Sequence, residues 1–340
     1  MSKSKRKKAE ESAFPVFINP KTDFGFKKIF GNKERLMAFL NAVLSENVVY
    51  IEYIPQEQLG ERAEDRKAIY DLYCKNSKGE RFIVEMQKAG QPNFADRALF
   101  YSTYPIRAQA PKGKIKLKDK SGKTVLKPWD YFLNKVYFIA ILDFVLFEEE
   151  SAKDIVMEEI ELIRKNSGIA FTDKLKFVII ELPKFSKTEA ESETPTDKWL
   201  YSLKNMEYLH QCPEQFDEEI FQNLYEEAQI NKLKPEEMEA YNKSILEYDD
   251  VVLAVDYAES RGELRGEKRG IQIGEQRGIR IGEKKGMQIG EQKGIRIGEQ
   301  KGKTSVVLNL YRRGLPIEDI ADITNFTVEQ VKDILSENVR

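Results

Sequence analysis

The chain has 340 residues, which suggests about two domains and leaves enough length for a large buried core. Apolar residues make up 41% and charged residues 33%, the profile of a globular protein rather than a disordered one. A formal net charge of −2 excludes a basic field over the whole molecule, so any nucleic-acid surface must be a local patch. No apolar run approaches the roughly 20 residues that span a bilayer, so we expect no membrane partner.

Cysteine and histidine are too scarce to carry most kinds of enzyme site. The two cysteines, Cys74 and Cys212, lie far apart, which fits a reducing compartment such as the cytoplasm. With His210 as the single histidine, the sequence disfavours triads that depend on histidine and zinc sites built from Cys and His. Carboxylates and lysines are therefore the side chains expected to do any catalysis.

The N-terminal segment, residues 1–13, is basic and is not followed by an apolar region. This predicts a disordered, solvated tail rather than a secretory signal. Residues 14–46 are expected to be helical, with Thr22 or Asp23 as the N-cap. Apolar residues later in this segment recur at helical spacing: Leu36, Phe39, Leu40, Val43 and Leu44.

Residues 67–87 predict a β-hairpin whose arms are joined by the sequence Asn-Ser-Lys-Gly. This sequence fits a type I turn followed by Gly79 in the left-handed conformation. Continued outward from such a turn, the pairing places Asp71 directly opposite Glu85 on one face of the sheet. Gln87 follows on the same face, because side chains alternate along a strand.

Residues 91–109 predict a helix that carries Arg97. The segment 112–127 is rich in lysines that alternate as on one face of a strand: Lys112, Lys114, Lys116, Lys118 and Lys120. Two interpretations stay open for this segment. Its lysines could contact DNA phosphates without reading sequence, or they could form the solvated face of an edge hairpin that lysine protects from aggregation.

A nearly continuous apolar run at 136–147 predicts a strand buried on both faces. The segments 155–163 and 175–182 are expected to be the arms of a further hairpin. The following extension, 191–260, is expected to be helical and amphipathic. Its core candidates are Trp199, Leu203, Met206, Leu209, Phe216, Ile220 and Leu224.

Residues 261–302 form a repeat in which glycine occupies every fourth position, with an eight-residue unit such as GIRIGEKK. Each interior glycine costs a helix about 1 kcal/mol, and the Ile-x-Ile spacing suits a strand. Glycines four apart nevertheless lie near one face of a helix, where they would allow close helix approach. Three alternatives stay open: a long helix that makes the protein a homo-oligomer, a flexible linker, or a small β-array.

Residues 303–340 predict a compact helical module. Helices are expected at about 304–313 and 317–324, and a third begins at Thr327, where Gln330 completes a capping box. A helix, a short turn and a helix outline a DNA-reading helix-turn-helix, but many three-helix caps have the same outline.

Asp71 and Glu85 meet the needs of metal-assisted phosphodiester cleavage. That reaction requires an activated water and stabilisation of charge on the phosphate, and Mg²⁺ held by carboxylates supplies both. Both acids lie in arms otherwise rich in apolar residues, where a buried charge is costly without a partner. The alternative is that both are solvated on a half-exposed sheet face, because the pattern of Asp, Glu and Gln87 is loose.

Several segments together resemble the recombination-promoting nuclease and transposase family, a branch of the PD-(D/E)XK nucleases. The segment NPKTDFGFKKIFG is similar to that family's opening motif, with Asp23, Phe26, Lys27 and Phe30 at matching positions. YDLYCKNSKGERFIVEMQ resembles its central hairpin, and RALFYSTYPIRAQ resembles the helix that follows. YFLNKVYFIAILDF, DKLKFVIIELPKF and DKWLYSLKN resemble later segments, and the glycine repeat and helical end resemble the family's tails.

The resemblance implies an α/β fold, a restriction-endonuclease-like PD-(D/E)XK core over 14–190 with a mixed β-sheet flanked by helices. It also implies an Mg²⁺-dependent DNA endonuclease linked to DNA recombination. We expect a bacterial, cytoplasmic protein. By this resemblance Asp71 is the metal-binding aspartate and Glu85 the acid of the (D/E)XK motif, while Asp23 is either an upstream acid near the metal or a helix cap. Gln87 takes the place of the broader superfamily's motif lysine, and the Glu-x-Gln form is typical of this branch. Glutamine can orient a water, but it cannot supply positive charge.

A nearby lysine is expected to compensate for that substitution. Lys88 should point to the opposite face of the strand, so Lys67 or Lys27 is the expected residue. The candidate DNA contacts are Lys27, Arg97, Lys114, Lys116 and Lys118.

The substitution also leaves a second hypothesis open, a catalytically silent DNA-binding or self-assembling protein on the same fold. A three-acid transposase ranks lowest, because no clear third acid can be placed with Asp71 and Glu85. Asp143 lies in an apolar strand and is interpreted as structural, with a weak case as that third acid.

Overall fold

The structure, a computed structural model, describes residues 15–44, 46–58, 68–90, 93–111, 115–118 and 123–338, without the side chains of residues 58, 115–118 and 125. The predicted tail at 1–13 lies outside the described residues. The chain forms two compact units, Met1–Tyr257 and Ala258–Arg340.

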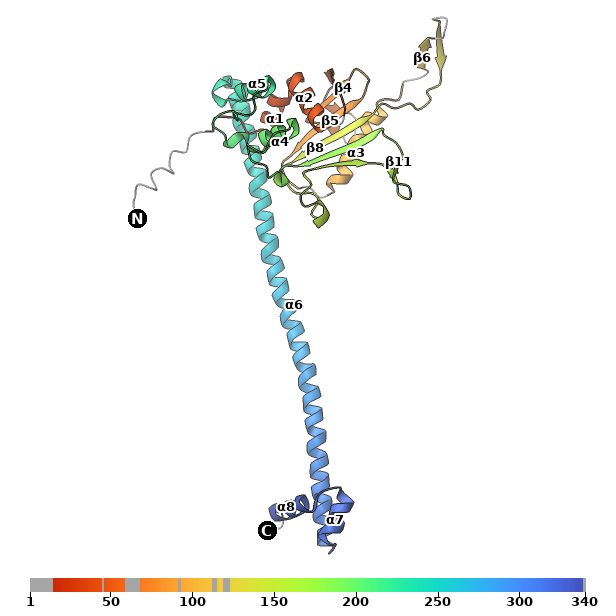
Figure 1. Ribbon diagram of the computed structural model, residues 1–340, viewed down its shortest axis with the longest axis vertical. Coiled ribbons are helices and arrows are strands. Elements are labelled where there is room, and N and C mark those ends of the chain that lie inside the picture. The colour runs from red at the N-terminus through yellow and green to blue at the C-terminus, as the bar shows by residue number, and fades with distance from the viewer. Residues whose placement is uncertain are drawn as a thin grey trace, which may run out of the picture. The chain divides into compact units, whose positions relative to one another are not determined.

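Six strands of the first unit form one mixed sheet, in the spatial order β1-β4-β5-β8-β12-β9 (Figure 1). Their bounds are β1 Ile51–Tyr53, β4 Leu72–Asn76, β5 Arg81–Gln87, β8 Val136–Leu142, β12 Leu175–Glu181 and β9 Met157–Glu161. The central strands β5, β8 and β12 run parallel, whereas the outer pairings are antiparallel. Every residue of β8 is buried, which confirms the strand predicted to be covered on both faces. The pairing of β9 with β12 confirms the second predicted hairpin.

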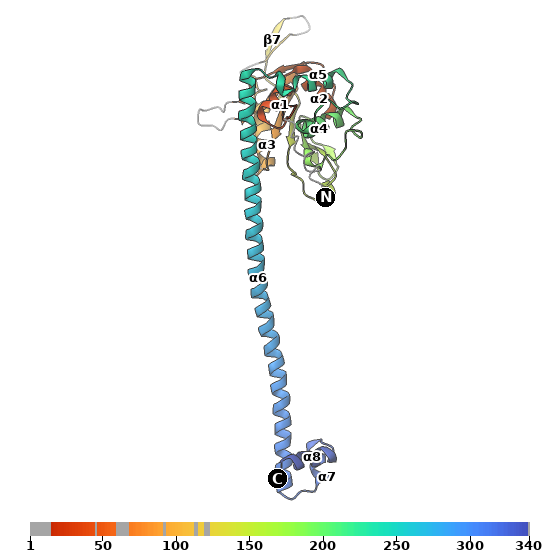
Figure 2. The same cartoon turned by 90° about the vertical axis from the view of Figure 1, so that its left-hand side faces the viewer.

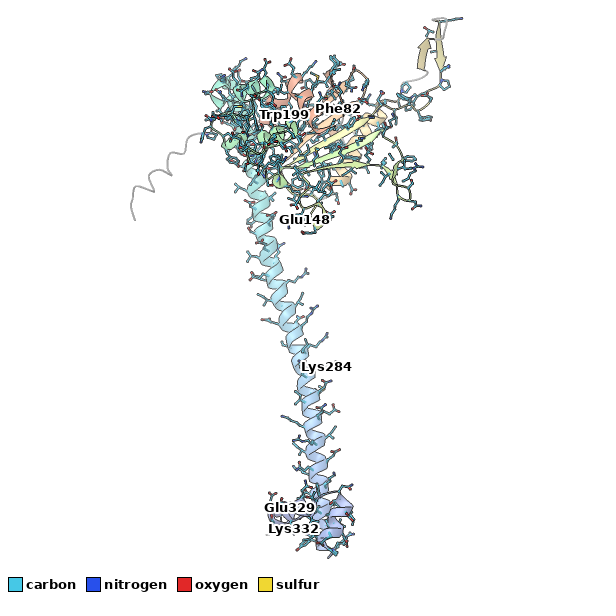
Figure 3. The ribbon with its side chains drawn as sticks, viewed as in Figure 1. Phe82, Glu148, Trp199, Lys284, Glu329 and Lys332 are labelled. Carbon is cyan, nitrogen blue, oxygen red and sulfur yellow. The ribbon has the colours of Figure 1, made fainter. Side chains whose placement is uncertain are left out.

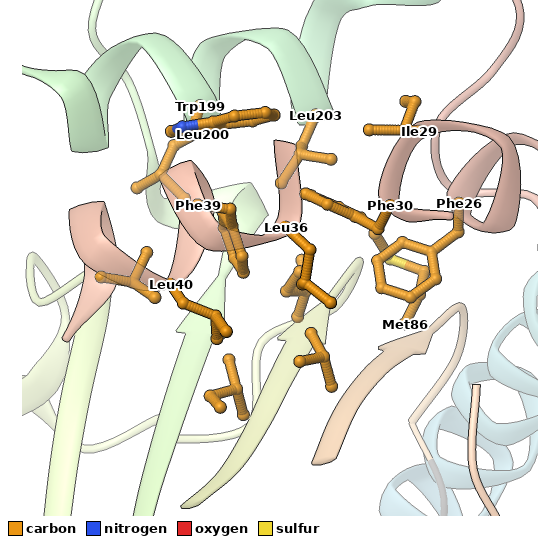
Figure 4. Close-up of a cluster of buried hydrophobic side chains, with 14 of the residues drawn as sticks. Phe26, Ile29, Phe30, Leu36, Phe39, Leu40, Met86, Trp199, Leu200 and Leu203 are labelled. Carbon is orange, nitrogen blue, oxygen red and sulfur yellow. The ribbon is translucent and has the colours of Figure 1, made fainter. Parts of the chain in front are cut away.

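One face of the sheet is covered by α1 (Asp23–Phe30), α2 (Lys33–Val43) and α4 (Pro195–Asn205), with α5 (Glu219–Glu227) packed against them. Trp199 of α4 packs against Phe30 and Phe39, with ring centroids 5.5 and 5.8 Å apart (Figure 4). Val84 and Met86 of β5 belong to the same cluster of buried side chains. The helices that follow residue 190 therefore share one hydrophobic core with the sheet.

Helix α3 (Phe94–Arg107) covers the other face, which confirms the helix predicted for that segment. Phe94 and Ala98 pack against Phe138 and Ala140 of β8. Helices thus lie on both faces of a mixed sheet, as the predicted α/β fold requires.

The β4–β5 hairpin has the predicted register. Leu72 pairs with Val84, so the next step outward brings Asp71 beside Glu85. Gly79 has a φ of +81°, the left-handed conformation that the turn sequence predicted. The first arm was wrongly expected to be continuous. The chain bends at Asp71, because the residues before it form a separate strand that pairs elsewhere.

Shorter elements complete the first unit. The strands are β2 Glu57–Gln58, β3 Ala68–Ile69, β6 Ile115–Lys118, β7 Thr124–Lys127, β10 Ile163–Arg164 and β11 Ile169–Ala170. The 3-10 helices are η1 Glu150–Ala152, η2 Leu182–Lys184, η3 Met206–Tyr208 and η4 Ile230–Lys232. β6 and β7 pair in antiparallel fashion, so these two described stretches of the lysine-rich segment are extended, as its alternation predicted.

Helix α6 (Pro235–Arg312) begins in the first unit and lies beside α1 (Figure 2). The Tyr241 hydroxyl accepts a hydrogen bond from the Asn19 N–H (2.9 Å), and Ser244 Oγ accepts one from the Phe24 N–H (3.0 Å). Tyr248 follows at the same helical spacing. One stripe of α6 is therefore fixed against the segment that leads into α1.

In the second unit, the glycine repeat is helical and belongs to α6, so of the three alternatives the structure has the helix. Side chains along it, including Lys284, project away from the helix axis (Figure 3). The repeat leads into α7 (Ile317–Thr324) and α8 (Val328–Asn338), which pack with the end of α6 around Val307 and Ile320. The predicted capping box is present, because the Thr327 side chain and Gln330 exchange hydrogen bonds with each other's backbone N–H. Among the described residues, no helix combines the length and apolar character needed to cross a membrane.

Candidate active site

A pocket of about 240 Å³ lies at the carboxyl end of β5. Its lining residues are Lys21, Asp23, Phe26, Asp71, Met86, Gln87, Lys88, Ala89 and Val251. One wall belongs to the hydrophobic core, where Phe26 of α1 lies next to Met86 of β5 (Figure 4). The carboxyl ends of parallel strands are the usual position of ligand sites in sheets of this kind. The core therefore holds the elements that carry the polar side chains of the pocket.

Two hydrogen bonds between side chain and backbone join Asp71 to Glu85 and to the next residue, Met86. The Asp71 N–H donates to Glu85 Oε1 (3.3 Å), and the Met86 N–H donates to Asp71 Oδ2 (2.8 Å). Glu85 is only 2% exposed, whereas Asp71 is half-buried and lines the pocket. The hairpin register thus brings both acids to the same end of the β4–β5 pair.

Gln87 and Arg97 hold the Glu85 carboxylate. Gln87 Nε2 donates to Glu85 Oε2 (3.1 Å), and Arg97 Nη1 donates to Gln87 Oε1 (3.3 Å). Arg97 Nη2 also lies 3.9 Å from Glu85 Oε2. Arg97, a candidate DNA contact by sequence, is therefore engaged with the acidic pair in this structure.

Both acids lie where negative charge is unfavourable. Burial raises the pKa of the Glu85 carboxyl to about 8, and the charge of Asp71 acts in the same direction. Burial also raises the pKa of Asp71, against the opposing hydrogen bond from Met86, and the charge of Asp23 adds to the rise. A pair of this kind retains a proton near neutral pH unless a cation neutralises its charge.

Asp23 and Lys27 reach this site from the first turns of α1. Thr22 caps the helix, because its Oγ1 accepts a hydrogen bond from the Gly25 N–H (3.0 Å). Asp23 is therefore not the cap. Its carboxylate lines the pocket and forms an ion pair with Lys27 (2.8 Å).

A second polar cluster, which the sequence analysis did not predict, adjoins the pocket. Lys21 Nζ lies 3.0 Å from Glu207 Oε1 and 3.5 Å from Asp143 Oδ2. The Tyr248 hydroxyl donates to the same Asp143 oxygen (2.6 Å). Burial acts to lower the pKa of Lys21, but these two carboxylates outweigh it, and the pKa is raised. No local pattern could reveal this cluster, because its members come from four distant segments.

Lys88 lines the pocket together with Gln87, although strand alternation assigns the two side chains to opposite faces. The pocket lies at the end of β5 rather than over one face, so both residues border it. Lys67 and Lys114 lie outside the described residues. Lys116 and Lys118 belong to β6, but their side chains are not part of the described structure.

The acidic pair fits a hard divalent cation. Carboxylate and amide oxygens are the donors present, and Mg²⁺ commonly binds through one or two carboxylates while it keeps several waters. Within the described ranges, no group of three or more His, Cys, Asp or Glu side chains is arranged to hold a metal. The raised pKa values of Asp71 and Glu85 also agree with a cation site, because a bound cation would favour the ionised form of both side chains.

A mixed sheet with helices on both faces, and an acidic pair at the end of a central hairpin, define a protein of the PD-(D/E)XK nuclease class. Comparison with known families agrees. Residues 20–258 match the model of a protein family described as PD-(D/E)XK nuclease family transposase. The chain belongs to this family. Searches of curated proteins and of solved structures gave no match.

Proposed function

We propose that the protein is an Mg²⁺-dependent DNA endonuclease that hydrolyses phosphodiester bonds and thereby promotes DNA recombination. The observation that carries the proposal is the pair of carboxylates, Asp71 and Glu85, buried together at the edge of the pocket. A nuclease family that covers both residues supports it.

In this proposal each side chain has a distinct role. Asp71 and Glu85 would hold the metal, which supplies an activated water and charge stabilisation when bound. Gln87 and Arg97 orient the Glu85 carboxylate, as their hydrogen bonds indicate. Asp23, which also lines the pocket, would hold a water of the metal or accept a proton. In the reaction, the water oxygen bonds to phosphorus, the bond to the leaving oxygen breaks, and that oxygen takes up a proton.

The direct test incubates purified protein with supercoiled plasmid and Mg²⁺, beside an EDTA control and the Asp71→Asn variant. We expect nicked or linear plasmid from the wild type alone. Cutting by Asp71→Asn at the wild-type rate would remove the acidic pair from the mechanism. Preparations of both proteins should first be matched by thermal melting, so that a folding defect is not read as lost chemistry.

A second candidate function rests on Gln87, which brings no positive charge to the site. It is a catalytically silent protein of the same fold that binds DNA or assembles. DNA binding without cutting, on linear, supercoiled and single-stranded substrates with Mg²⁺ or Mn²⁺, would favour it.

DNA contacts outside the pocket and self-association belong to the same proposal. The lysines of the β6–β7 segment would contact phosphates, and their replacement should weaken binding to all sequences alike. The repeat would join copies of the chain. Its four-residue period exceeds the 3.6 residues of a helical turn, so paired helices would coil with a right-handed sense. The two free cysteines agree with a cytoplasmic location.

A further inference from the structure

Asp71 of the acidic pair lines the pocket, but Gln87 stands where the broader PD-(D/E)XK superfamily has its motif lysine. Four basic side chains of the described chain line the pocket or act on its acids, and three of them are already paired with acidic side chains. Lys21 is buried between Asp143 and Glu207. The other two are tied to the site's own polar groups, Lys27 to Asp23 and Arg97 to the Glu85 and Gln87 side chains.

Lys88 is the fourth. It follows β5 directly, lines the same pocket as Asp71, and forms no ion pair with a carboxylate in the part of the chain that is described. Its ammonium group lies 5.8 Å from the ring centroid of Tyr248 on α6. A lysine on a flexible stem at this position can present its charge to an anion that enters the pocket.

Tyr248 is placed to position that ammonium group. The Lys21 ammonium also lies against its ring, 5.7 Å from the centroid, and its hydroxyl is bound to Asp143. The ring is thus fixed at one edge by the buried cluster and faces Lys88 as well. An aromatic face attracts a cation without neutralising it, so Lys88 keeps a full charge for a phosphate.

We propose that Lys88 supplies the positive charge that Gln87 lacks, by contacting the scissile phosphate, and that Tyr248 positions it. This inference rests on the proposed nuclease function. It assigns the compensating cation to a residue that strand alternation alone would reject. It also makes α6 part of the site.

The test compares Lys88→Ala and Lys88→Arg with Lys75→Ala, a control at the far end of β4 whose lysine pairs with Glu52. Removal of one charge-stabilising donor should slow cleavage about 100-fold at saturating DNA and Mg²⁺. Lys88→Arg should recover most of the rate, and Lys75→Ala should match the wild type. A Lys88→Ala rate equal to the Lys75→Ala rate, with Asp71→Asn inactive, would overturn the inference but leave the nuclease function standing.

DNA affinity provides a readout that does not depend on cleavage. In the Asp71→Asn background without metal, Lys88→Ala should reduce the slope of log affinity against log salt by about one. If the wild type cuts no substrate, the proposed function fails, and this slope still decides whether Lys88 meets a phosphate. An unchanged slope would then reject that contact.

Two variants of Tyr248 test its positioning role. Tyr248→Phe keeps the ring but loses the hydroxyl's hydrogen bond to Asp143, so its cleavage rate should fall between the rates of the wild type and Tyr248→Leu. Tyr248→Leu should approach the rate of Lys88→Ala. Addition of Lys88→Ala to Tyr248→Leu should slow the reaction no further, because both act through one contact. Equal losses in Tyr248→Phe and Tyr248→Leu would show that the hydroxyl, not the ring, matters, and would overturn this part.

Discussion

The end of β5 and the glycine repeat of α6 place side chains in opposite surroundings. At the end of β5, acidic and amide side chains are enclosed, and Glu85 is only 2% exposed. In the repeat, large apolar side chains are open to solvent, with Ile279 63% and Met287 75% exposed. The first region keeps polar groups inside at an energetic cost, which is typical of functional sites. The second has apolar surface that the rest of the described chain does not cover.

The space around the glycines also differs between α1 and the repeat. At Gly25, a Cβ atom would lie 2.0 Å from the Asn19 carbonyl oxygen, so only glycine fits where α1 begins. At Gly278 and its counterparts along the repeat, a Cβ atom would have no described atom of another element within 4 Å. One glycine is required by a close backbone approach, and the others are not required by any contact with the described residues.

The largest effect on cleavage should come from a substitution of Glu85, the enclosed acid. Glu85→Gln keeps the shape of the side chain but removes a metal ligand, and cleavage should fall about 1,000-fold. Melting of the metal-free protein near neutral pH should show no loss of stability, because the neutral amide resembles the protonated carboxyl that the folded protein holds there. Plasmid cleavage and thermal melting measure the two expectations. A variant that cuts at the wild-type rate would contradict the first.

Gly25→Ala should produce the largest loss of stability. Its Cβ must displace backbone, and overpacking of this kind typically costs about 1–3 kcal/mol or more. Chemical denaturation of the first unit's transition measures the loss. Ala38→Gly, on a partly buried position of α2, is a comparison in which a helix loses rather than gains a methyl group. A Gly25→Ala protein as stable as the wild type would mean that α1 can shift freely.

The stability of the metal-free protein should depend on pH because Glu85 is a buried acid. The folded protein holds the Glu85 proton up to about pH 8, above the ordinary pKa of 4.5. Between those values the folded state binds more protons than the unfolded state, so metal-free stability falls as pH rises. Glu85→Gln should flatten this decline. Mg²⁺ should raise the melting temperature more at pH 8 than at pH 6, because it competes with the proton.

A small effect is expected from Gly278→Ala. The change should stabilise the helix locally by about 1 kcal/mol, since alanine is the better helix former. Hydrogen exchange in the full chain should show several-fold slower exchange of amides around residue 278, with cleavage unchanged. Faster exchange would instead show that a partner packs closely against the glycines. Mass measured by light scattering, with and without residues 258–340, would identify such a partner as a second copy.

Much of the fold could be predicted from the sequence, because it depends on patterns of neighbouring residues such as turns, apolar runs and helix caps. The Asn-Ser-Lys-Gly turn determines the register that brings Asp71 to Glu85, and the apolar run at 136–147 identifies the central strand. The capping box at Thr327 is likewise a short-range pattern. The conformation of the repeat could not be chosen from local rules, because glycine disfavours a helix while the four-residue spacing permits one.

Only the tertiary structure decides which side chains surround the acidic pair. The sequence alone determined the hairpin register that brings Asp71 beside Glu85, because turn geometry and side-chain alternation set it. The α/β class and the roles proposed for the two acids followed from the family resemblance. The cluster of Lys21, Asp143 and Glu207 joins segments far apart in the chain, and Lys88 enters the pocket because the pocket lies beyond the strand end. Such neighbours depend on how the helices pack on the sheet, and no spacing along the chain records that packing.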